Sequence, residues 1–311
     1  MPRPPEPEPE RKENWFFLLF LRGYHFPPGM FWSMLTLGTM TAIMCLWQYH
    51  YRYFEIKLPL TLHGLLGFVV SLLLVFRTNS AYERWWEGRR LLGQLNDNVR
   101  YLVLKVDAFV PEGDRASRNE LATWLCAFVW SLKEHLRQDE PEFSSNVVPL
   151  ELRAAYLESP HRPLFLLQRL NLLVARLYRE KALDQSQLRI VEGASRSVSD
   201  VVGGCERIKS TPIPLAYTLH LRRIILLYVG SLPFGLIYDY HWWAIPVVMA
   251  IFYVMAGIEF IGEEIEDPFG GDANDLPVGS LMARICDNIS ALLAVTNPTC
   301  PAPEVAPTES R

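Results

Sequence analysis

Long uncharged stretches alternate along the chain with charged stretches of helical periodicity. Four stretches are apolar enough to cross a bilayer, which takes about 20 apolar residues in a helix. They cover 30–47, 58–76, 224–238 and 242–262. The third is short by itself, and we expect it to continue a helix that begins near Pro214. Trp and Tyr cluster at the ends of these stretches, which is typical of the membrane–water boundary. The pattern predicts two membrane hairpins, with four buried helices of a soluble protein as the less favoured interpretation.

Between the hairpins, apolar residues recur every three or four positions, which predicts amphipathic helices. Clear examples are 119–137 and 162–183. Ser117 is followed by Glu120, the spacing of a capping box, at the start of the first example. We find no strand-rich segment, Gly-rich phosphate loop or internal repeat in the sequence. The predicted fold class is therefore all-α: a polytopic membrane protein with four transmembrane helices and a large helical cytoplasmic domain.

Lys and Arg are distributed unevenly around the four apolar stretches. The loops inside the two hairpins carry only Arg52 and Lys57 between them, whereas several basic residues flank the other ends. Cytoplasmic loops are the ones enriched in Lys and Arg. We therefore expect a multi-pass protein of the plasma membrane, with both termini and the whole stretch 77–222 in the cytoplasm.

These observations divide the chain into six parts. The parts are a disordered tail, a membrane hairpin that includes the second apolar helix, a cytoplasmic helical domain, a second membrane hairpin, an acidic turn with a cytoplasmic helix, and a second disordered tail. Their bounds are 1–14, 15–76, 77–212, 213–262, 263–295 and 296–311. The first tail is rich in Pro and Glu and lacks the layout of a cleaved signal peptide.

Composition narrows the class of protein further. Half of the 311 residues are hydrophobic, yet a fifth are charged, which suits a few spanning segments joined to a sizeable part in water. A net charge of −4 argues against a nucleic-acid partner, because such proteins carry a basic face. The five cysteines are scattered without CxxC or zinc-ligand spacing, so we expect free thiols.

Three motifs carry a family resemblance. VFRTNSAYERWWEGRRLLG (75–93) resembles the segment that bacterial and eukaryotic bestrophins carry just after their pore-lining helix. ERIKSTPIPLAY (206–217) resembles the segment that leads into their third membrane helix, and GEEIEDPFGGDANDLP (262–277) the acidic turn after their fourth. The order and spacing of all three match, and the similarity extends over nearly the whole chain apart from the two tails.

The resemblance implies a homopentamer with five copies of the second apolar helix around a central pore. Carried over by position, the narrow neck of the pore consists of Phe68, Leu72 and Phe76, and a cytoplasmic constriction lies at Ile213. Phe68, Leu72 and Phe76 are spaced four residues apart and so share one stripe of a helix. Rings of large apolar side chains can gate a pore by dewetting, and aromatic edges are electropositive, which suits an anion. Leu72 departs from family necks made only of Ile and Phe.

Two charged features sit beside this predicted pore. For the patch 77–89 we favour a structural role over direct ion contact, with Arg84 paired to Glu83, Glu87 or a carboxylate of the acidic turn. The acidic turn matches the calcium clasp of eukaryotic bestrophins, but its run of acidic residues is less dense than theirs. The residues that match the clasp's Ca²⁺ ligands are Asp272 and Asp275 through their side chains, and Glu264 and Asp267 through their backbone carbonyls.

The less dense run of acidic residues in this turn argues against tight calcium regulation. No cofactor is required for the predicted function, and a helix-ending turn whose carboxylates cap helices and pair with Arg is the favoured interpretation of this segment.

The predicted function is a passive channel for chloride and other small anions, and a channel of the same fold selective for monovalent cations is the alternative. Arg77, Arg222 and Arg223 would attract anions to the inner mouth, whereas the acidic turn would attract cations. We expect no enzyme, because the only His, Asp or Glu residues in the membrane segments are His63 and Glu259 and no catalytic motif is present. A transporter would show inverted repeats, which we do not detect. A non-conducting scaffold stays open.

Overall fold

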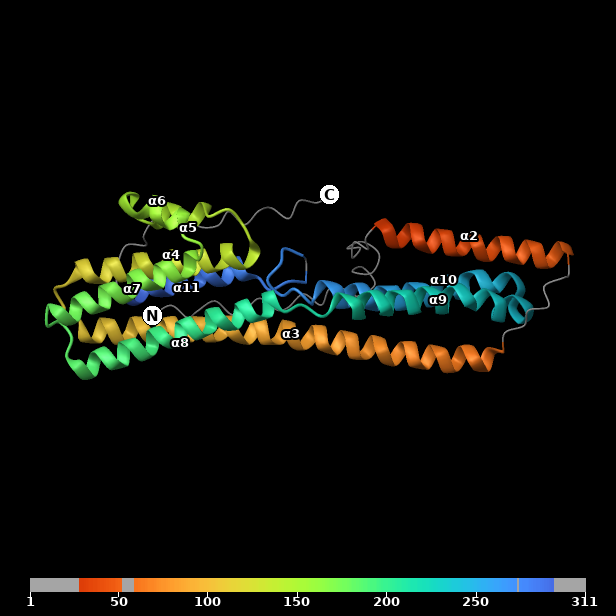
Figure 1. The fold of residues 1–311 in the computed structure, drawn as a ribbon, viewed down its shortest axis with the longest axis horizontal. Helices are drawn as coiled ribbons and strands as arrows, with labels where there is room; N and C mark the ends of the chain where they lie inside the picture. The colour runs from red at the N-terminus through yellow and green to blue at the C-terminus, as the bar shows by residue number, and fades with distance from the viewer. Residues whose placement is uncertain (1–27, 52–58, 273, 294–311) are drawn as a thin grey trace, which may run out of the picture. The chain divides into compact units, whose positions relative to one another are not determined.

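The computed structural model describes residues 28–51, 59–272 and 274–293, and every regular element in these ranges is a helix (Figure 1). The elements in chain order are α2 (Pro28–Tyr51), α3 (Leu60–Phe109), α4 (Arg115–Arg137), α5 (Glu142–Val147), α6 (Leu150–Glu158), α7 (Arg162–Arg179), α8 (Gln185–Ser210), α9 (Leu215–Tyr240), the short 3₁₀ helix η1 (His241–Trp243), α10 (Ala244–Glu264) and α11 (Val278–Leu293). The predicted all-helical class is confirmed. The two predicted tails, 1–14 and 296–311, lie outside the described residues.

Three helical stretches in the described part of the chain are long and apolar enough to cross a membrane. They are Gly29–His50, Leu60–Phe109 and Leu215–Glu264, and the last contains α9, η1 and α10 in succession. The short third apolar segment of the sequence is thus part of a 26-residue helix, α9, which begins directly after Pro214. The second segment does not end at the charged patch, because α3 continues through it for 50 residues in all.

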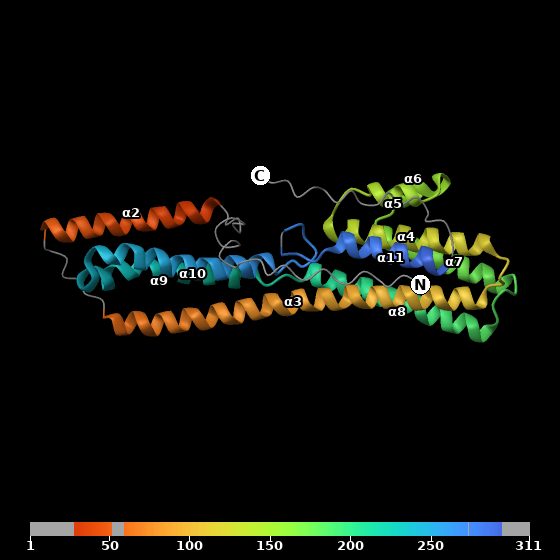
Figure 2. The ribbon, with the colours of Figure 1, turned by 180° about the vertical axis from the view of Figure 1, so that it is seen from behind.

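The chain divides into two compact units, each described here by itself. Unit 1 contains the described residues up to Leu74 together with His220–Ile258. Unit 2 contains Val75–Leu219 and the described residues from Glu259 onward. In unit 1, α9 and α10 lie side by side in both views of the ribbon (Figures 1 and 2). The buried residues of unit 1 are mostly aliphatic side chains from α3, α9 and α10, such as Val70, Val229 and Val248.

Two close contacts join α3 to α9 within unit 1. The buried imidazole of His63 reaches Ser231, with Nε2 3.1 Å from its carbonyl oxygen and 3.2 Å from its Oγ. Four residues on, Gly67 faces Tyr228, and a Cβ at this glycine would lie 2.5 Å from the Tyr228 hydroxyl oxygen. His63 is thus tied into helix packing, as expected of a polar group that has no water to bond with.

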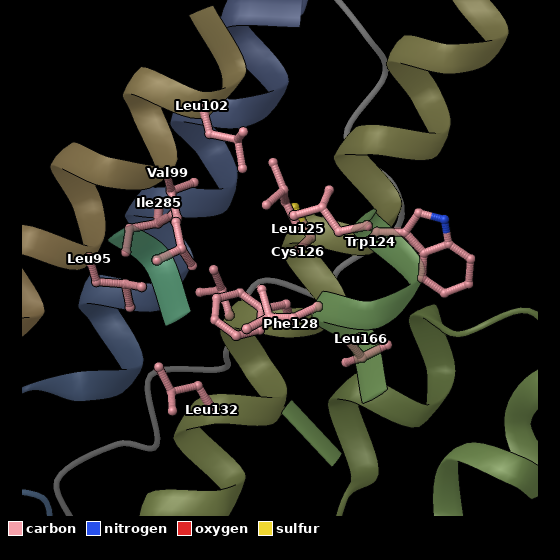
Figure 3. Packing of buried hydrophobic residues seen from close by; sticks show 14 of the residues in the cluster. Leu95, Val99, Leu102, Trp124, Leu125, Cys126, Phe128, Leu132, Leu166 and Ile285 are labelled. Carbon is pink, nitrogen blue, oxygen red and sulfur yellow. The ribbon is translucent and has the colours of Figure 1, made fainter. Parts of the chain in front are cut away.

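Unit 2 has a single large apolar core (Figure 3). Helix α4 packs against α5, α7 and α11, and α7 packs against α8. Leu95, Val99 and Leu102 of α3 lie in the same cluster as Leu125 of α4 and Ile285 of α11. The helices predicted from periodicity over 119–137 and 162–183 are α4 and α7. α7 buries one apolar face in this core, whereas α4 is buried on all sides over Trp124–Leu132.

The start of α4 differs from the prediction. Its N-cap is Asp114, whose Oδ1 accepts the backbone N–H of Ser117 at 3.0 Å, so Ser117 lies inside the helix. Glu120 is instead bound by Arg176 of α7 at 2.5 Å. A complete capping box is present at the start of α8, between Asp184 and Gln187. Sequence spacing placed the helix correctly but its cap one turn too late.

The cysteines behave as predicted where they are described. Cys45, Cys126, Cys205 and Cys286 are buried and take part in no disulfide among the described residues. Burial raises the pKa of the Cys205 thiol to about 12, so this thiol stays protonated and unreactive at neutral pH. Cys300 lies outside the described residues.

Candidate functional site

The predicted neck residues lie along one exposed stripe of α3. Phe68, Leu72 and Phe76 have exposed fractions of 67%, 43% and 56% in the single chain. The spacing of four residues holds because α3 is helical throughout this stretch. Farther along the same stripe, Asn79 and Glu83 are also exposed. The chain therefore presents a row of large apolar side chains that ends in polar ones.

The opposite stripe of α3 is buried. Val70 and Leu74 lie in the core of unit 1, and Arg77 in unit 2 is only 1% exposed. α3 thus has one face that the chain covers and one face that it leaves open. Since Arg77 is on the covered side, the expectation that it attracts anions at an inner mouth is wrong for this residue.

Arg77 belongs to a group of polar contacts that we call the polar junction, made of Arg77, Arg84, Ile213 and Glu266. One carboxylate oxygen of Glu266 accepts Arg77 Nη2 at 2.5 Å, and the other accepts the backbone N–H of Ile213 at 2.8 Å. A single carboxylate therefore holds α3, the α8–α9 link and the turn after α10 together, all within unit 2.

Arg84 fastens the same three segments from its own position on α3. Its guanidinium donates to the carbonyl oxygens of Glu266 at 3.0 Å, Ile208 at 2.7 Å and Thr211 at 2.5 Å. The carbonyls of Ile208 and Thr211 lie at the end of α8, where helix C-termini leave acceptors unsatisfied. Arg84 thus reaches the acidic turn through a backbone carbonyl, and the predicted pairing with a carboxylate is wrong.

The rest of the charged patch also contacts the acidic turn. The indole N–H of Trp85 donates to the carbonyl of Asn274 at 3.1 Å, whereas Trp86 is exposed. Gly88 is covered closely, since a Cβ there would lie 3.0 Å from Pro268. These contacts are what the favoured structural interpretation of the patch predicts.

The acidic turn is folded on itself around Asp275. One carboxylate oxygen of Asp275 accepts the backbone N–H of Asp272 at 2.6 Å, and its other oxygen is buried with no hydrogen-bond partner among the described residues. Gly270 is required here, because a Cβ would lie 2.6 Å from the Asp275 carboxylate. The Asp267 carbonyl accepts the N–H of Gly270 at 3.2 Å, and the Glu264 carboxylate accepts from the Asn274 side chain at 2.6 Å.

The surroundings of Asp275 disfavour its negative charge. Burial, followed by the charges of Asp272 and Asp267, raises its pKa to about 6. A carboxylate with an unsatisfied buried oxygen is a group that a cation would stabilise. Asp272 is exposed, so the two predicted side-chain ligands differ in environment.

Sequence reasoning did not single out Glu266. It appeared only as one of six acidic residues in the turn, and nothing in its spacing distinguishes it from its neighbours. The sequence feature that could have pointed to Glu266 is Arg77, which directly follows Phe76 at the end of the apolar stretch. An arginine buried at the end of an apolar helix requires a carboxylate partner, and the nearest conspicuous set of carboxylates was this turn.

Comparison with known proteins places these features in a family. The family described as bacterial/fungal bestrophin protein matches residues 8–291. The chain belongs to this bestrophin family. The voltage-dependent anion channel-forming protein alr2987 of Nostoc sp. is 34% identical over 296 residues, which cover 90% of this chain and 93% of that protein. The protein of the same description called YneE from Escherichia coli K12 is 34% identical over 238 residues, covering 76% and 77%.

Solved bestrophin structures agree with the fold. A bacterial bestrophin homologue from Klebsiella pneumoniae superposes with a TM-score of 0.81 at 30% sequence identity, covering 86% of this chain and 99% of that one. Together with the three apolar helical stretches, this identifies the chain as an all-helical membrane protein of the bestrophin family.

Proposed function

We propose that this bestrophin forms a homopentameric channel that passively conducts chloride and other small anions across the plasma membrane. Its relatives in Nostoc and Escherichia coli are named as voltage-dependent anion channel-forming proteins. Four membrane helices, from α2, the first part of α3, α9 and α10, would span the bilayer, with both termini in the cytoplasm. The positive-inside distribution of Lys and Arg supports this orientation.

The observation that carries the proposal is the open stripe of α3. Phe68, Leu72 and Phe76 are large, apolar and exposed, while the other side of the same helix is buried. Five such stripes around an axis would make a narrow apolar neck, which can close by dewetting without a plug. The exposed Asn79 and Glu83 would follow the neck where the pore widens into water.

Ile213 would form the second constriction. It lies in the non-helical link between α8 and α9, where its backbone N–H is held by Glu266. The polar junction would therefore fix the position of the constriction relative to the neck-bearing helix. Because Arg77 and Arg84 are engaged in these contacts, their proposed role is to position backbone rather than to bind ions.

Anion selectivity is supported by the relatives' names and by the electropositive ring edges of Phe68 and Phe76. Selectivity for monovalent cations is the alternative, and the exposed Glu83 near the end of the stripe is the observation that favours it.

For the acidic turn we propose weak Ca²⁺ binding rather than tight regulation. The partnerless buried oxygen of Asp275 supports the proposal, because Ca²⁺ prefers carboxylate and carbonyl oxygens. The Asp272 side chain and the carbonyls of Glu264 and Asp267 would supply the other ligands. Among these ligand groups, the Asp267 carbonyl and one Asp275 oxygen already accept hydrogen bonds within the turn, which argues for low affinity. Tb³⁺ luminescence should detect the site in the purified protein, and a signal equal in the Asp275→Asn variant would contradict it.

The test of the function is a reversal potential. Purified protein is fused into planar bilayers under a KCl gradient, and the expected value lies near the chloride equilibrium potential. A value near the potassium potential would keep the channel and establish the cation alternative. Replacing all three neck residues with Ala should raise the open probability, because smaller side chains leave room for water. No current from either the wild type or this variant would overturn the channel proposal.

A further inference from the structure

A cluster of two histidines and one glutamate lies in unit 2 and shares no residue with the polar junction. His135 stands near the end of α4, His161 is the N-cap of α7, and Glu206 lies on α8. Both imidazole Nε2 atoms approach the same Glu206 oxygen, His135 at 2.9 Å and His161 at 2.5 Å. The two rings are 4.7 Å apart between centroids. Three helices thus bring together three side chains with nitrogen and oxygen donor atoms.

In the absence of a metal, the hydrogen bonds determine which ring nitrogen of each histidine carries the proton. A carboxylate oxygen only accepts, so each Nε2 carries its proton toward Glu206. The Nδ1 of His161 accepts the backbone N–H of Leu164 at 3.3 Å, which places the proton of that ring on Nε2. Burial lowers the pKa of His135. His135 is therefore neutral at pH 7, the form that binds metal ions.

We propose that His135, His161 and Glu206 bind a zinc-like divalent transition-metal ion. Two imidazole nitrogens and one carboxylate oxygen are a donor set that zinc accepts, with a fourth position left for water. Their ligand atoms lie within 4.8 Å of one another. A tetrahedral zinc ion needs about 3.3 Å between ligand atoms, so side-chain shifts of about 1 Å are enough.

The site is open to an ion from solvent. The side chains of His135, His161 and Glu206 are 34%, 28% and 33% exposed. A cavity of about 220 Å³ opens beside His135, with Ser131, Ser159 and Arg162 among the residues that line it. This cavity leaves room for a water molecule bound to the metal. Arg162 and the nearby Lys209 place positive charge close to the site, which limits the affinity.

Binding exchanges one set of contacts for another. Each imidazole binds the ion through Nε2, so its proton moves from Nε2 to Nδ1, and the Nδ1 of His161 then no longer caps α7 through Leu164. The metal therefore competes with a helix cap and, at lower pH, with protonation of the imidazoles, so affinity rises with pH. The bound ion would pin the end of α8 to α4 and α7. The carbonyl of Ile208, two residues after Glu206, accepts a hydrogen bond from Arg84 of the polar junction. Metal binding by the three side chains does not require that the protein conducts ions.

Isothermal titration of the full-length protein in detergent with ZnCl₂ tests the proposal, after removal of any affinity tag and stripping with EDTA. We expect about one ion per protomer, with binding weaker at pH 6 than at pH 7.5. His135→Gln and Glu206→Gln should each weaken binding by at least about tenfold. Glu192→Gln, which removes an exposed carboxylate from the same helix, should leave binding unchanged. Equal zinc binding by the wild type and the two site variants would overturn the proposal.

A measurement on the wild type alone guards against variants that fail to fold. Co²⁺ in a site of this kind is four-coordinate and absorbs much more strongly in the visible range than Co²⁺ in water. Appearance of this absorption, and its loss when Zn²⁺ is added, would support the site. A spectrum that stays that of aqueous Co²⁺ would overturn it.

Discussion

The two units of the chain bury and expose apolar residues in opposite ways. In unit 2, α7 and α8 bury one apolar stripe and turn polar residues outward. In unit 1, large apolar side chains such as Trp32 on α2 and Leu227 on α9 are exposed. The difference follows from the solvent, because a Leu facing lipid loses nothing that a Leu facing water would lose.

Polar groups on α2 differ from those that join the segments of unit 2. On α2, the hydroxyls of Ser33, Thr36, Thr39 and Thr41 donate to carbonyls of the preceding turn, so these groups are satisfied within one helix. In unit 2, Glu266 and Arg84 link separate segments. Inside a bilayer every polar group needs a partner at hand, and a helix can supply it from its own backbone.

The largest expected effect comes from Glu266→Ala in unit 2. The change leaves Arg77 buried without its carboxylate and releases the N–H of Ile213. Removing one partner of a buried ion pair costs about 3–5 kcal/mol in the free energy of unfolding. Thermal unfolding in detergent measures the loss, with Glu192→Ala, at an exposed carboxylate on α8 of the same unit, as the control. Equal stability of the two variants would mean that the polar junction does not hold the unit together.

A matched pair of truncations tests the comparison between the units directly. Leu125→Ala removes a fully buried side chain from the core of unit 2 and should cost about 2–5 kcal/mol. Leu227→Ala removes a side chain that is 74% exposed in unit 1 and should cost less than about 0.5 kcal/mol. Both are measured as shifts in thermal unfolding in the same detergent. A large loss at Leu227 would show that this face is packed against protein in the assembly.

A smaller effect of opposite sign is expected from Asp275→Asn. Because the folded-state pKa is raised to about 6, the ionised carboxylate is disfavoured in the fold, and stability is lost as pH rises from about 4 through 6. The neutral Asn avoids this loss and should stabilise the protein by about 1 kcal/mol at pH 7.5, after allowing for solvent screening. Unfolding is followed in EDTA at pH 7.5 and at pH 4.5, where the gain should vanish. Asp200→Asn, at an exposed position on α8, is the control, and a gain of the same size at both pH values would contradict the pKa argument.

Much of the fold could be predicted from hydrophobic periodicity. The apolar stretch 30–47 corresponds to α2, and the amphipathic stretch 162–183 to α7. Both could be predicted because the environment of a helix determines which of its positions are apolar. The spacing of Phe68, Leu72 and Phe76 was likewise enough to place them on one stripe. What the stripe faces came from family resemblance, since an apolar residue that faces lipid, protein or a pore has the same side-chain chemistry.

The contacts between distant segments could not be predicted. Glu266 and Arg77 are far apart in sequence, and their pairing depends on how α10 ends beside α3 within unit 2. The convergence of His135, His161 and Glu206 likewise depends on the packing of three helices. Sequence patterns fix which face of a helix is buried, but the partner across the interface is set by tertiary packing.

The central claim is that the open stripe of α3 lines the ion path, and cysteine accessibility tests it most directly. Leu72→Cys is made in a Cys300→Ser background, whose other cysteines are buried. A charged, membrane-impermeant thiol reagent is then applied during bilayer recording. The account predicts that current through Leu72→Cys changes irreversibly, whereas Val70→Cys, on the buried stripe, is unaffected. Modification of Val70→Cys with no effect on Leu72→Cys would place the pore on another face and contradict the account.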